Sequence, residues 1–241
     1  MKIINAIWEL RNLGVTCTEV LVEPGDQDDA VLTHLNELPL GYQVVKVPVA
    51  RVGLMNTLQR AKFTYIESSI RVEHGLEIKQ PEGLFNRMVS MCDYVMLGNE
   101  EIERVSREIQ SDMFTTDRVS LDPKFTREQA SNRYVNWMFD VVSRGGSVYE
   151  LRKEDNGIGF FLFQQDSERV GNSPLAGLYP SSNTLGFGNV LLHLLLVEAK
   201  KRKLRRMVQQ VSTNNPAVVK NHMEQGFKIR GIHYVFVRHA S

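Results

Sequence analysis

Hydrophobic and polar positions change their period several times along this chain, and each change marks an element. In the first part, apolar residues recur at helical spacing over 3–13, 27–38 and 52–61. Between these stretches lie short apolar runs typical of strands, over 17–22, 43–49 and 63–72. Elements that alternate in this way are typical of a sheet covered by helices. The pattern therefore predicts an α/β unit at the start of the chain.

A break follows at 74–81, where glycine and proline interrupt the pattern, and we interpret it as the crossing between two halves. The sequence next predicts a strand over 93–97, a helix over 99–110, a polar loop over 111–125 and a helix over 126–142. Thr126 and Gln129 are spaced as a capping box at the start of the last of these helices.

From residue 147 the pattern is again typical of strands. Strands are predicted over 148–152 and 158–163, joined by the hairpin turn Glu154-Asp155-Asn156-Gly157. The remaining elements are a strand over 175–179, a helix over 190–203, a strand over 207–211, a helix over 216–224 and closing strands over 227–237. We therefore predict two domains, 1–110 and 111–241.

A loop with two glycines joins the strand 175–179 to the helix that follows. It reads Asn183-Thr184-Leu185-Gly186-Phe187-Gly188. Unpaired backbone N–H groups at a helix start favour a pyrophosphate, and glycines let the backbone approach it closely. The loop lacks the third glycine of a Rossmann fingerprint and the lysine of a Walker loop. A helix cap or a close packing point explains the two glycines equally well.

A second block follows at Asn215-x-x-Val218 and His222-x-x-x-Gly226-Phe227. Together the two blocks resemble the Gcn5-related N-acetyltransferase (GNAT) superfamily. That family's loop reads Gln/Arg-x-x-Gly-x-Gly/Ala, and its later block reads Asn-x-x-Ala…Tyr-x-x-x-Gly-Phe. The resemblance covers roughly the last half of the chain. It implies an α/β fold with a mixed central sheet flanked by helices, preceded by a smaller, degenerate GNAT-like N-terminal domain.

The resemblance implies acetyl-coenzyme A as co-substrate and no metal. Its pyrophosphate would lie on the loop 185–189, and its pantetheine would run beside the strand 175–179. An amine would attack the thioester directly while a backbone N–H holds the oxyanion. The implied cofactor-binding residues are Leu178, Tyr179, Asn183, Leu185, Gly186, Phe187, Gly188, Asn189 and Asn215. Asn215 is also suited to be a helix N-cap, because Pro216 follows it.

Two positions depart from the family pattern. Asn183 replaces Gln or Arg, which removes a side-chain contact to phosphate but keeps the backbone cradle. His222 replaces the Tyr that protonates the departing thiolate, so His222 is the predicted catalytic acid, or else a residue that only lines the pocket. For the general base, Glu150 and Asp140 are candidates, and a chain of water molecules is the alternative.

Composition excludes several other classes of function. The chain of 241 residues has 29 Lys and Arg against 28 Asp and Glu, so its net charge of +1 indicates neither a nucleic acid nor a membrane partner. The basic run 200–206 ends a helix and lacks interleaved aromatics, which favours a solvated helix end. His193 has no partner at metal-ligand spacing. Two cysteines and no apolar leader favour a cytoplasmic protein.

The N-terminal half contains a partial echo of the second block. Leu58-x-x-x-Lys62-Phe63 matches the order of His222-x-x-x-Gly226-Phe227, which indicates a degenerate copy of the same unit. Its counterpart of the glycine loop, over 23–29, is acidic and would repel a pyrophosphate. Only the C-terminal half is therefore expected to bind coenzyme A.

The identity of the acceptor is less defined. Leu121-Asp122-Pro123-Lys124-Phe125, followed by a helix with Tyr134 and Trp137, resembles the TDP-fucosamine N-acetyltransferase branch, which implies a nucleotide-linked amino sugar. Amino-acid, polyamine or protein amines are alternatives, and so is a non-catalytic acyl-coenzyme A-binding regulator. A monomer and a homodimer are both compatible with the sequence.

Overall fold

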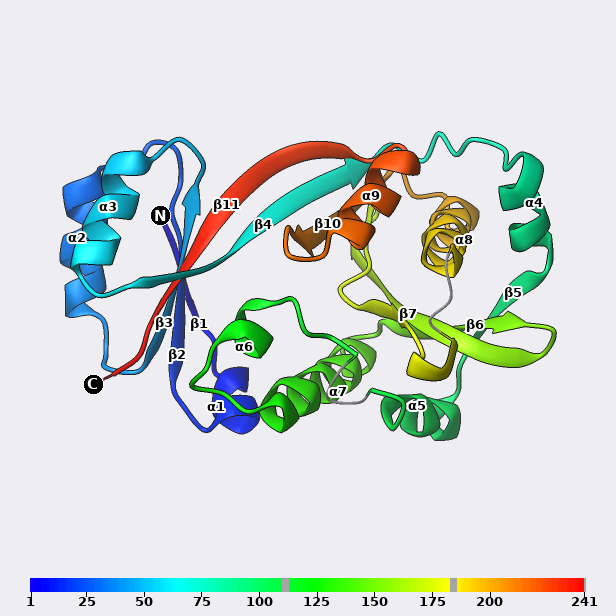
Figure 1. Cartoon of the computed structure of the whole chain (residues 1–241), viewed down its shortest axis with the longest axis horizontal. Helices are drawn as coiled ribbons and strands as arrows, with labels where there is room; N and C mark the ends of the chain where they lie inside the picture. The colour runs from blue at the N-terminus through cyan, green and yellow to red at the C-terminus, as the bar shows by residue number, and fades with distance from the viewer. Residues whose placement is uncertain (110–112, 183–185, 241) are drawn as a thin grey trace.

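One mixed sheet with helices on both faces organises the chain (Figure 1). The computed structural model describes residues 1–109, 113–182 and 186–240, and these contain eleven strands. The strands are β1 (Lys2–Asn5), β2 (Cys17–Leu21), β3 (Tyr42–Pro48), β4 (Thr64–His74), β5 (Cys92–Met96), β6 (Ser147–Lys153), β7 (Asn156–Ser167), β8 (Val170–Asn172), β9 (Ala176–Leu178), β10 (Arg206–Ser212) and β11 (Lys228–Arg238). Their order is β1-β2-β3-β11-β4-β10-β8-β7-β6-β5, with β9 also paired to β7.

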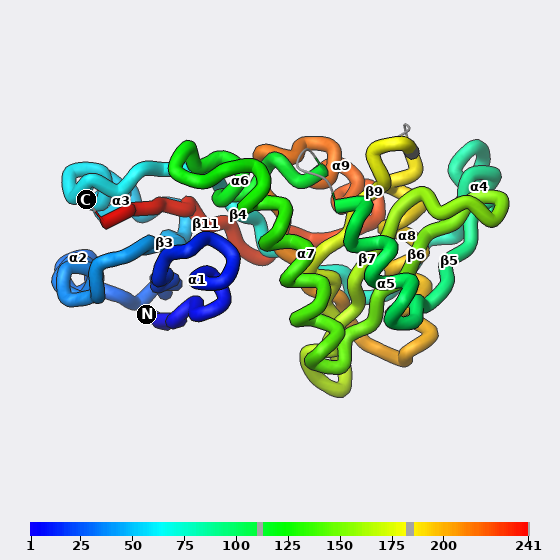
Figure 2. The backbone as a smooth tube through the Cα atoms, turned by 90° about the horizontal axis from the view of Figure 1, so that it is seen from below, coloured from blue at the N-terminus to red at the C-terminus, as the bar shows by residue number. Residues whose placement is uncertain are grey.

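Helices cover this sheet along its whole length. They are α1 (Trp8–Leu13), α2 (Asp28–Glu37), α3 (Val52–Arg60), α4 (Gly83–Ser90), α5 (Asn99–Ser106), α6 (Arg118–Leu121), α7 (Arg127–Ser143), α8 (Phe187–Lys201) and α9 (Pro216–Glu224), with the short 3-10 helix η1 (Pro180–Ser182). Seen from below in Figure 2, α1 and α7 lie side by side between the two halves. None of the helices in the described ranges has the length and apolar character that crossing a membrane requires.

The two halves exchange their closing strands. β11 follows α9 but pairs with β3, and β4 follows α3 but pairs with β10. The two strands also pair with each other, and Figure 1 shows them running side by side from one half to the other. The predicted boundary at residue 110 stays a prediction, and strand pairing crosses it in both directions. Each half therefore depends on a strand that the other half supplies.

The predicted echo between the halves has a structural counterpart. The Phe63 N–H donates to the Leu58 carbonyl at 2.9 Å, and the Phe227 N–H donates to the His222 carbonyl at 3.0 Å. The residue before each phenylalanine is left-handed, with φ of 65° at Lys62 and 90° at Gly226. Both helices thus end in the same left-handed cap, with a buried phenylalanine after it.

This equivalence predicts opposite effects at the two caps. Lys62 has a Cβ, so its left-handed conformation is sterically unfavourable, whereas Gly226 has no Cβ and adopts this conformation without strain. We expect Lys62→Gly to stabilise the protein by about 1 kcal/mol and Gly226→Ala to destabilise it by about the same amount. Urea unfolding of both variants measures this. Two changes of the same sign would contradict the equivalence.

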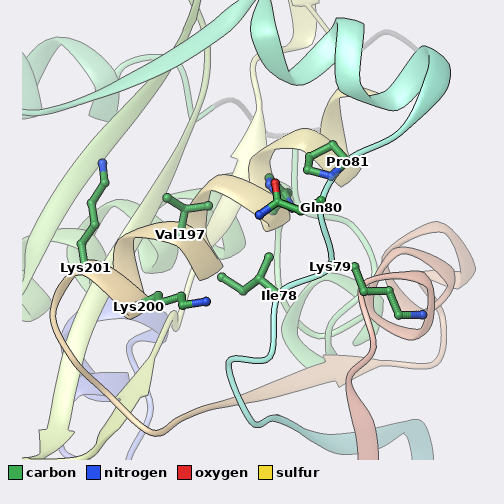
Figure 3. Close-up of a pocket in the computed structure, with 8 residues that line it drawn as sticks. Ile78, Lys79, Gln80, Pro81, Val197, Lys200 and Lys201 are labelled. Atoms are coloured by element: carbon green, nitrogen blue, oxygen red, sulfur yellow. The ribbon is translucent and has the colours of Figure 1, made fainter.

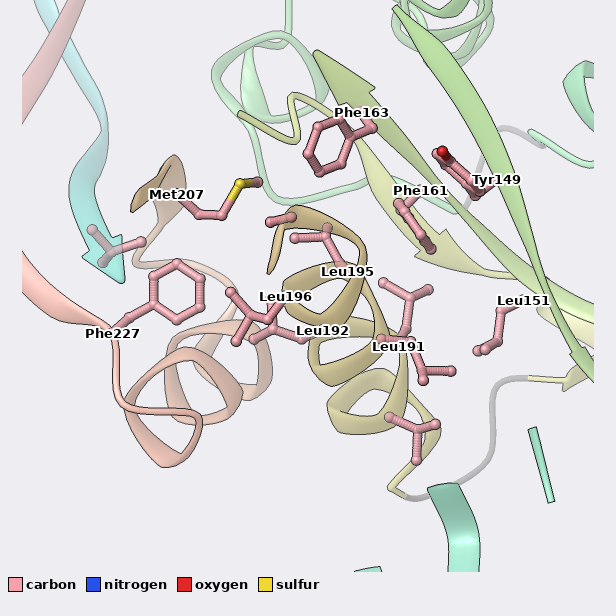
Figure 4. Packing of buried hydrophobic residues seen from close by; sticks show 14 of the residues in the cluster. Tyr149, Leu151, Phe161, Phe163, Leu191, Leu192, Leu195, Leu196, Met207 and Phe227 are labelled. Carbon is pink, nitrogen blue, oxygen red and sulfur yellow. The ribbon is translucent and has the colours of Figure 1, made fainter. Parts of the chain in front are cut away.

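The largest core cluster lies around α8. Figure 4 shows Leu192 and Leu196 of this helix directed toward Phe227, and Leu191 directed toward Phe161. All of these side chains are buried. The helix is apolar on nearly every face because β7 packs on one side of it and α9 on the other. This packing fixes where α8 begins.

Most predicted elements are confirmed, within a few residues at their ends. The capping box of α7 is present, with Thr126 and Gln129 bonded reciprocally. A hairpin turn joins β6 to β7 as predicted, but one residue earlier: Lys153 pairs with Asn156, and the central residues Glu154 and Asp155 both have positive φ, as a type I′ turn requires.

Two expectations about the elements were wrong, and one helix was missed. The predicted helix over 3–13 is strand β1 followed by α1, because pairing with β2 overrides a helical spacing of isoleucines. The predicted crossing at 74–81 is followed by a helix, α4, that the pattern did not reveal. The predicted loop over 111–125 contains α6, which the Asp117 side chain caps by accepting from the Val119 and Ser120 N–H groups.

Candidate functional site

A gap opens in the sheet between β9 and β10. β8 pairs in parallel with β10 from Val170 to Asn172, but among the described strands the continuing strand β9 pairs with β7 alone. The cause is an extra residue. Gln164 of β7 pairs with Asn172, and Leu162, two residues earlier in β7, bonds to Leu175, three residues after Asn172. The strand that contains β8 and β9 therefore has one more residue than β7 over this interval. Such a β-bulge, here containing a proline, bends the strand and ends its pairing with β10.

The free edge of β9 presents backbone groups to this gap. The Leu162 N–H donates to Leu175, and the Tyr179 N–H donates to Ile158. Because hydrogen-bonded pairs alternate along an antiparallel ladder, the N–H and C=O groups of Ala176 and Leu178 point away from β7. The predicted cofactor residue Leu178 thus lies at the gap, and its outward N–H and C=O groups pair with no strand among the described residues.

The start of α8 lies near the elements that flank the gap, because α8 contacts β9 and Gly188 lies close to Asn221 of α9. Gly186 is the N-cap with φ of 94°, and Phe187, Gly188 and Asn189 form the first turn. Helix geometry leaves the amide N–H groups of this first turn without partners inside the helix. The predicted residues Asn183 and Leu185 lie outside the described residues. The other predicted residues of the loop are therefore placed where an anion would bind the helix end.

Two neighbours of this helix start were not predicted from the sequence. The Lys153 ammonium lies 5.4 Å from the centre of the Phe187 ring and brings a positive charge to the helix start. A Cβ on Gly186 would come within 2.6 Å of the Met88 methyl group, so α4 packs closely against the glycine loop. Both contacts join segments far apart in the sequence, and no local motif reports them.

Asn215 has the capping role that its sequence indicated. Its side-chain oxygen accepts from the Val218 N–H at 3.1 Å, and Pro216 occupies the first helical position. α9 thereby begins beside the end of β10, across the gap from β9. The side chain is committed to the helix, so a contact with the co-substrate stays a prediction.

His222 lies inside the structure, behind β10. The side chain is 7% exposed, with Nδ1 2.8 Å from the Val218 carbonyl and Nε2 2.5 Å from the Gln209 side-chain oxygen. The first contact requires a proton on Nδ1. Burial lowers the pKa of His222, so the neutral ring is favoured at neutral pH.

The acid role of His222 stays a prediction, which its pH dependence can test. If the ring donates the proton, turnover must fall as pH rises through the lowered pKa of His222. We expect His222→Phe to lose that fall and to turn over about a hundredfold more slowly at its optimum. Steady-state thiol release against pH measures both proteins. Superimposable profiles would instead assign the ring to holding Gln209.

The candidate bases differ in their environments. Glu150 is 2% exposed and accepts from Arg104, Arg152 and the Tyr179 hydroxyl. Burial alone would raise the pKa of Glu150, but these hydrogen bonds outweigh it and lower that pKa, which makes the group a weak base. Tyr179 is buried with it, in the hydrophobic cluster that includes residues of α7.

Two other carboxyl groups lie on the face of the sheet that α7 covers. Asp140 pairs with Arg11 at 2.8 Å on the surface of α7. Glu67 of β4 is buried within hydrogen-bond reach of Ser212 at the end of β10, and burial raises the pKa of Glu67. The sequence did not point to Glu67, because only the exchange of β4 into the other half brings it there.

Two of the cavities among the described residues bear on the site. One, of about 290 Å³, lies between α8 and the segment 78–81 (Figure 3). Its lysines, Lys79, Lys200 and Lys201, extend in different directions. The other, of about 240 Å³, lies between α1, α7 and the exposed side chain of Gln210 on β10. Within the described part of the chain, no group of three or more His, Cys, Asp or Glu side chains is arranged to hold a metal ion.

Comparison with known proteins identifies the fold. No protein-family profile matches the sequence. No curated protein matches it either. A GCN5-related N-acetyltransferase from Sphaerobacter thermophilus superimposes with a TM-score of 0.67 at 12% identity, over 98% of this chain and 75% of that chain. The fold is that of the Gcn5-related N-acetyltransferases.

Two further GNAT structures show the same likeness. A GCN5-related N-acetyltransferase from Kribbella flavida gives a TM-score of 0.55 at 11% identity, over 92% of this chain and 80% of that chain. A tandem GNAT protein from the clavulanic acid biosynthesis pathway gives a TM-score of 0.57 at 11% identity, over 93% of this chain and 75% of that chain. Within the GNAT fold of this chain, the N-terminal half has no equivalent gap, because β2 and β3 pair from Cys17 to Leu21.

Proposed function

We propose that the protein is an acetyl-coenzyme A-dependent N-acetyltransferase acting on a small primary amine. The observation that carries the proposal is the gap between β9 and β10, whose flanking elements lie near the first turn of α8. An edge of free backbone groups beside a helix start suits a ligand that joins an amide-containing arm to a diphosphate. The fold and the two sequence blocks support the same proposed function.

Each part of the site then has a defined task. The edge of Ala176 and Leu178 would bind the amides of the pantetheine arm, as an added strand does. The first-turn N–H groups of α8, with Lys153 beside them, would hold the diphosphate. Acetyl-coenzyme A supplies an activated acyl group. A backbone N–H at the free edge would stabilise the oxyanion that forms when the amine attacks.

The class of the acceptor is supported by the sequence alone. The block 121–125 and the helix after it support a nucleotide-linked amino sugar, and amino acids, polyamines or protein amines are the other acceptors to be tested. The departures at Asn183 and His222 favour one alternative, a protein that binds acyl-coenzyme A without turnover.

Thermal unfolding with acetyl-coenzyme A and with free coenzyme A tests the binding step. At a ligand concentration a hundred times Kd, we expect about 2.7 kcal/mol of stabilisation. The absence of stabilisation by either compound would overturn the proposal. Thiol release across a panel of amines then separates an enzyme from a regulator that binds without turnover.

A further inference from the structure

The cavity beside Gln210 is a groove built by both halves of the chain. α1 and the neighbouring strands β2 and β3 contribute Trp8, Asn12, Glu19 and Lys46. α7 and its C-cap residue contribute a stripe at helical spacing, Arg133, Trp137, Asp140 and Arg144. At 1.5 Å per residue, this stripe extends about 16 Å along the helix axis. The groove is therefore elongated.

The groove reaches β10, the strand on one side of the gap in the sheet. Met207 and Val211 of β10 pack against α8, so the alternation of a strand places Gln210 on the opposite face, toward α7. Gln210 lies just beyond Val208, the last residue of β10 that pairs with β8. A molecule in this groove would reach the acyl group from the face opposite α8.

The carboxylates in the groove already have partners. Glu19 binds Arg118 and accepts from Lys46 at 2.9 Å, and Asp140 binds Arg11. An incoming ammonium group would therefore have to share a carboxylate that already pairs with a cation. This arrangement disfavours an acceptor that carries only positive charges.

The cations in the groove keep unused donors. Lys46 has three N–H groups and makes one ion pair, and its side chain is 23% exposed. Arg133 donates from Nε to Glu9, has its Nη1 3.7 Å from an Asp117 oxygen, and lies over the Trp137 ring at 5.6 Å. Among the described residues, its Nη2 has no carboxylate partner. Arg144 has no carboxylate partner within the part of the chain that the structure describes. The groove therefore has available cationic groups at both of its ends.

We propose that this groove binds the acceptor, and that the acceptor carries an anionic group in addition to its amine. The anionic group, a carboxylate or a phosphate, binds Lys46 and Arg133 at the end near α1. The body of the molecule lies against Trp8 and Trp137, and the amine lies beside Gln210. The charge of Arg144 at that end favours the neutral amine, which is the form that attacks a thioester. This assignment rests on the proposed function.

Tryptophan fluorescence tests the groove without requiring turnover. Trp8 and Trp137 are the two tryptophans of the chain, and both line the groove. Two matched pairs of probes differ only in the anion: para-(aminomethyl)benzoate with benzylamine, and phosphoethanolamine with ethanolamine. We expect the anionic member of at least one pair to change the fluorescence with saturation, at a concentration about tenfold lower than its neutral partner. The pair that responds identifies carboxylate or phosphate.

Two variants localise the effect. Lys46→Gln leaves Glu19 paired with Arg118. It should weaken binding of the anionic probe about tenfold and leave the affinity for the neutral probe unchanged. Lys200→Gln, which removes a lysine outside the groove, should change neither. Arg144→Gln, at an exposed position, should raise the pH at which acetylation becomes half-maximal.

The possible failures are distinguishable. Equal binding of both members in each pair, or no fluorescence change with any of the four probes, would overturn the groove assignment even if other amines are acetylated. Saturable fluorescence that depends on Lys46, together with no acetylated product, would leave the groove assignment standing and overturn the proposed function.

Discussion

Replacement of Gly188 by aspartate is expected to remove most acetyl-coenzyme A binding without destabilising the free protein. Gly188 lies in the first turn of α8, where a carboxylate interacts favourably with the helix dipole, by about 0.3–1 kcal/mol. The same carboxylate would repel a diphosphate on that turn by about 2 kcal/mol, which is roughly a thirtyfold loss of affinity. Calorimetric titration with acetyl-coenzyme A and thermal unfolding of the free variant measure the two effects separately.

Gly188→Asn is the matched control. A Cβ at this position comes within 3.1 Å of the Asn221 side-chain nitrogen in either variant, so the steric cost is shared and only the charge differs. We expect the asparagine variant to bind acetyl-coenzyme A close to the wild-type affinity. Equal affinities of the aspartate and asparagine variants would place the diphosphate elsewhere.

The second large effect is expected where the halves meet, at Arg118. This side chain is 6% exposed and binds Glu19 and the fully buried Glu9, its Nη2 lying 3.0 Å from a Glu9 oxygen. Arg118→Met would leave two buried carboxylates with one cation each, Arg133 and Lys46. We expect a loss of about 3–5 kcal/mol in the free energy of unfolding, measured in urea at neutral pH. Arg11→Met, which breaks an exposed pair, should cost less than about 1 kcal/mol.

The loss at Arg118 should also depend on pH. Burial alone would raise the pKa of Glu19, but the charges of Arg118 and Lys46 outweigh it and lower that pKa from 4.5 to about 2. Stability from a depressed carboxyl pKa is present above the unfolded value and is lost as pH falls through the folded value. The difference in the free energy of unfolding between wild type and Arg118→Met should therefore shrink as the pH falls from 4.5 to about 2. A difference that stays constant over this range would contradict the assignment to Glu19.

Local patterns were enough to predict most of the helices and strands after residue 126. The apolar run at 190–203 is α8, because a helix packed on both sides needs apolar residues on nearly every face. Pro216 after Asn215 marked the start of α9 correctly, since proline suits the first helical position. These features depend only on neighbours in the sequence.

The features that were missed depend on long-range pairing. The gap arises from one extra residue before Leu175, which becomes visible only when this strand is aligned with β7. Glu67 reaches the α7 face beside Ser212 only because β4 and β11 are exchanged between the halves. No periodicity within either strand reports its partner, so such sites require the assembled sheet.

The most direct test of the proposed function is to follow the acetyl group itself. Mass spectrometry of a reaction that contains the protein, isotopically labelled acetyl-coenzyme A and the amine panel should show one amine carrying the labelled acetyl group, with an equal amount of free coenzyme A. The Gly188→Asp protein should form this product far more slowly at the same concentrations. Intact acetyl-coenzyme A with every amine, or free coenzyme A without an acetylated amine, would contradict the assignment of an N-acetyltransferase.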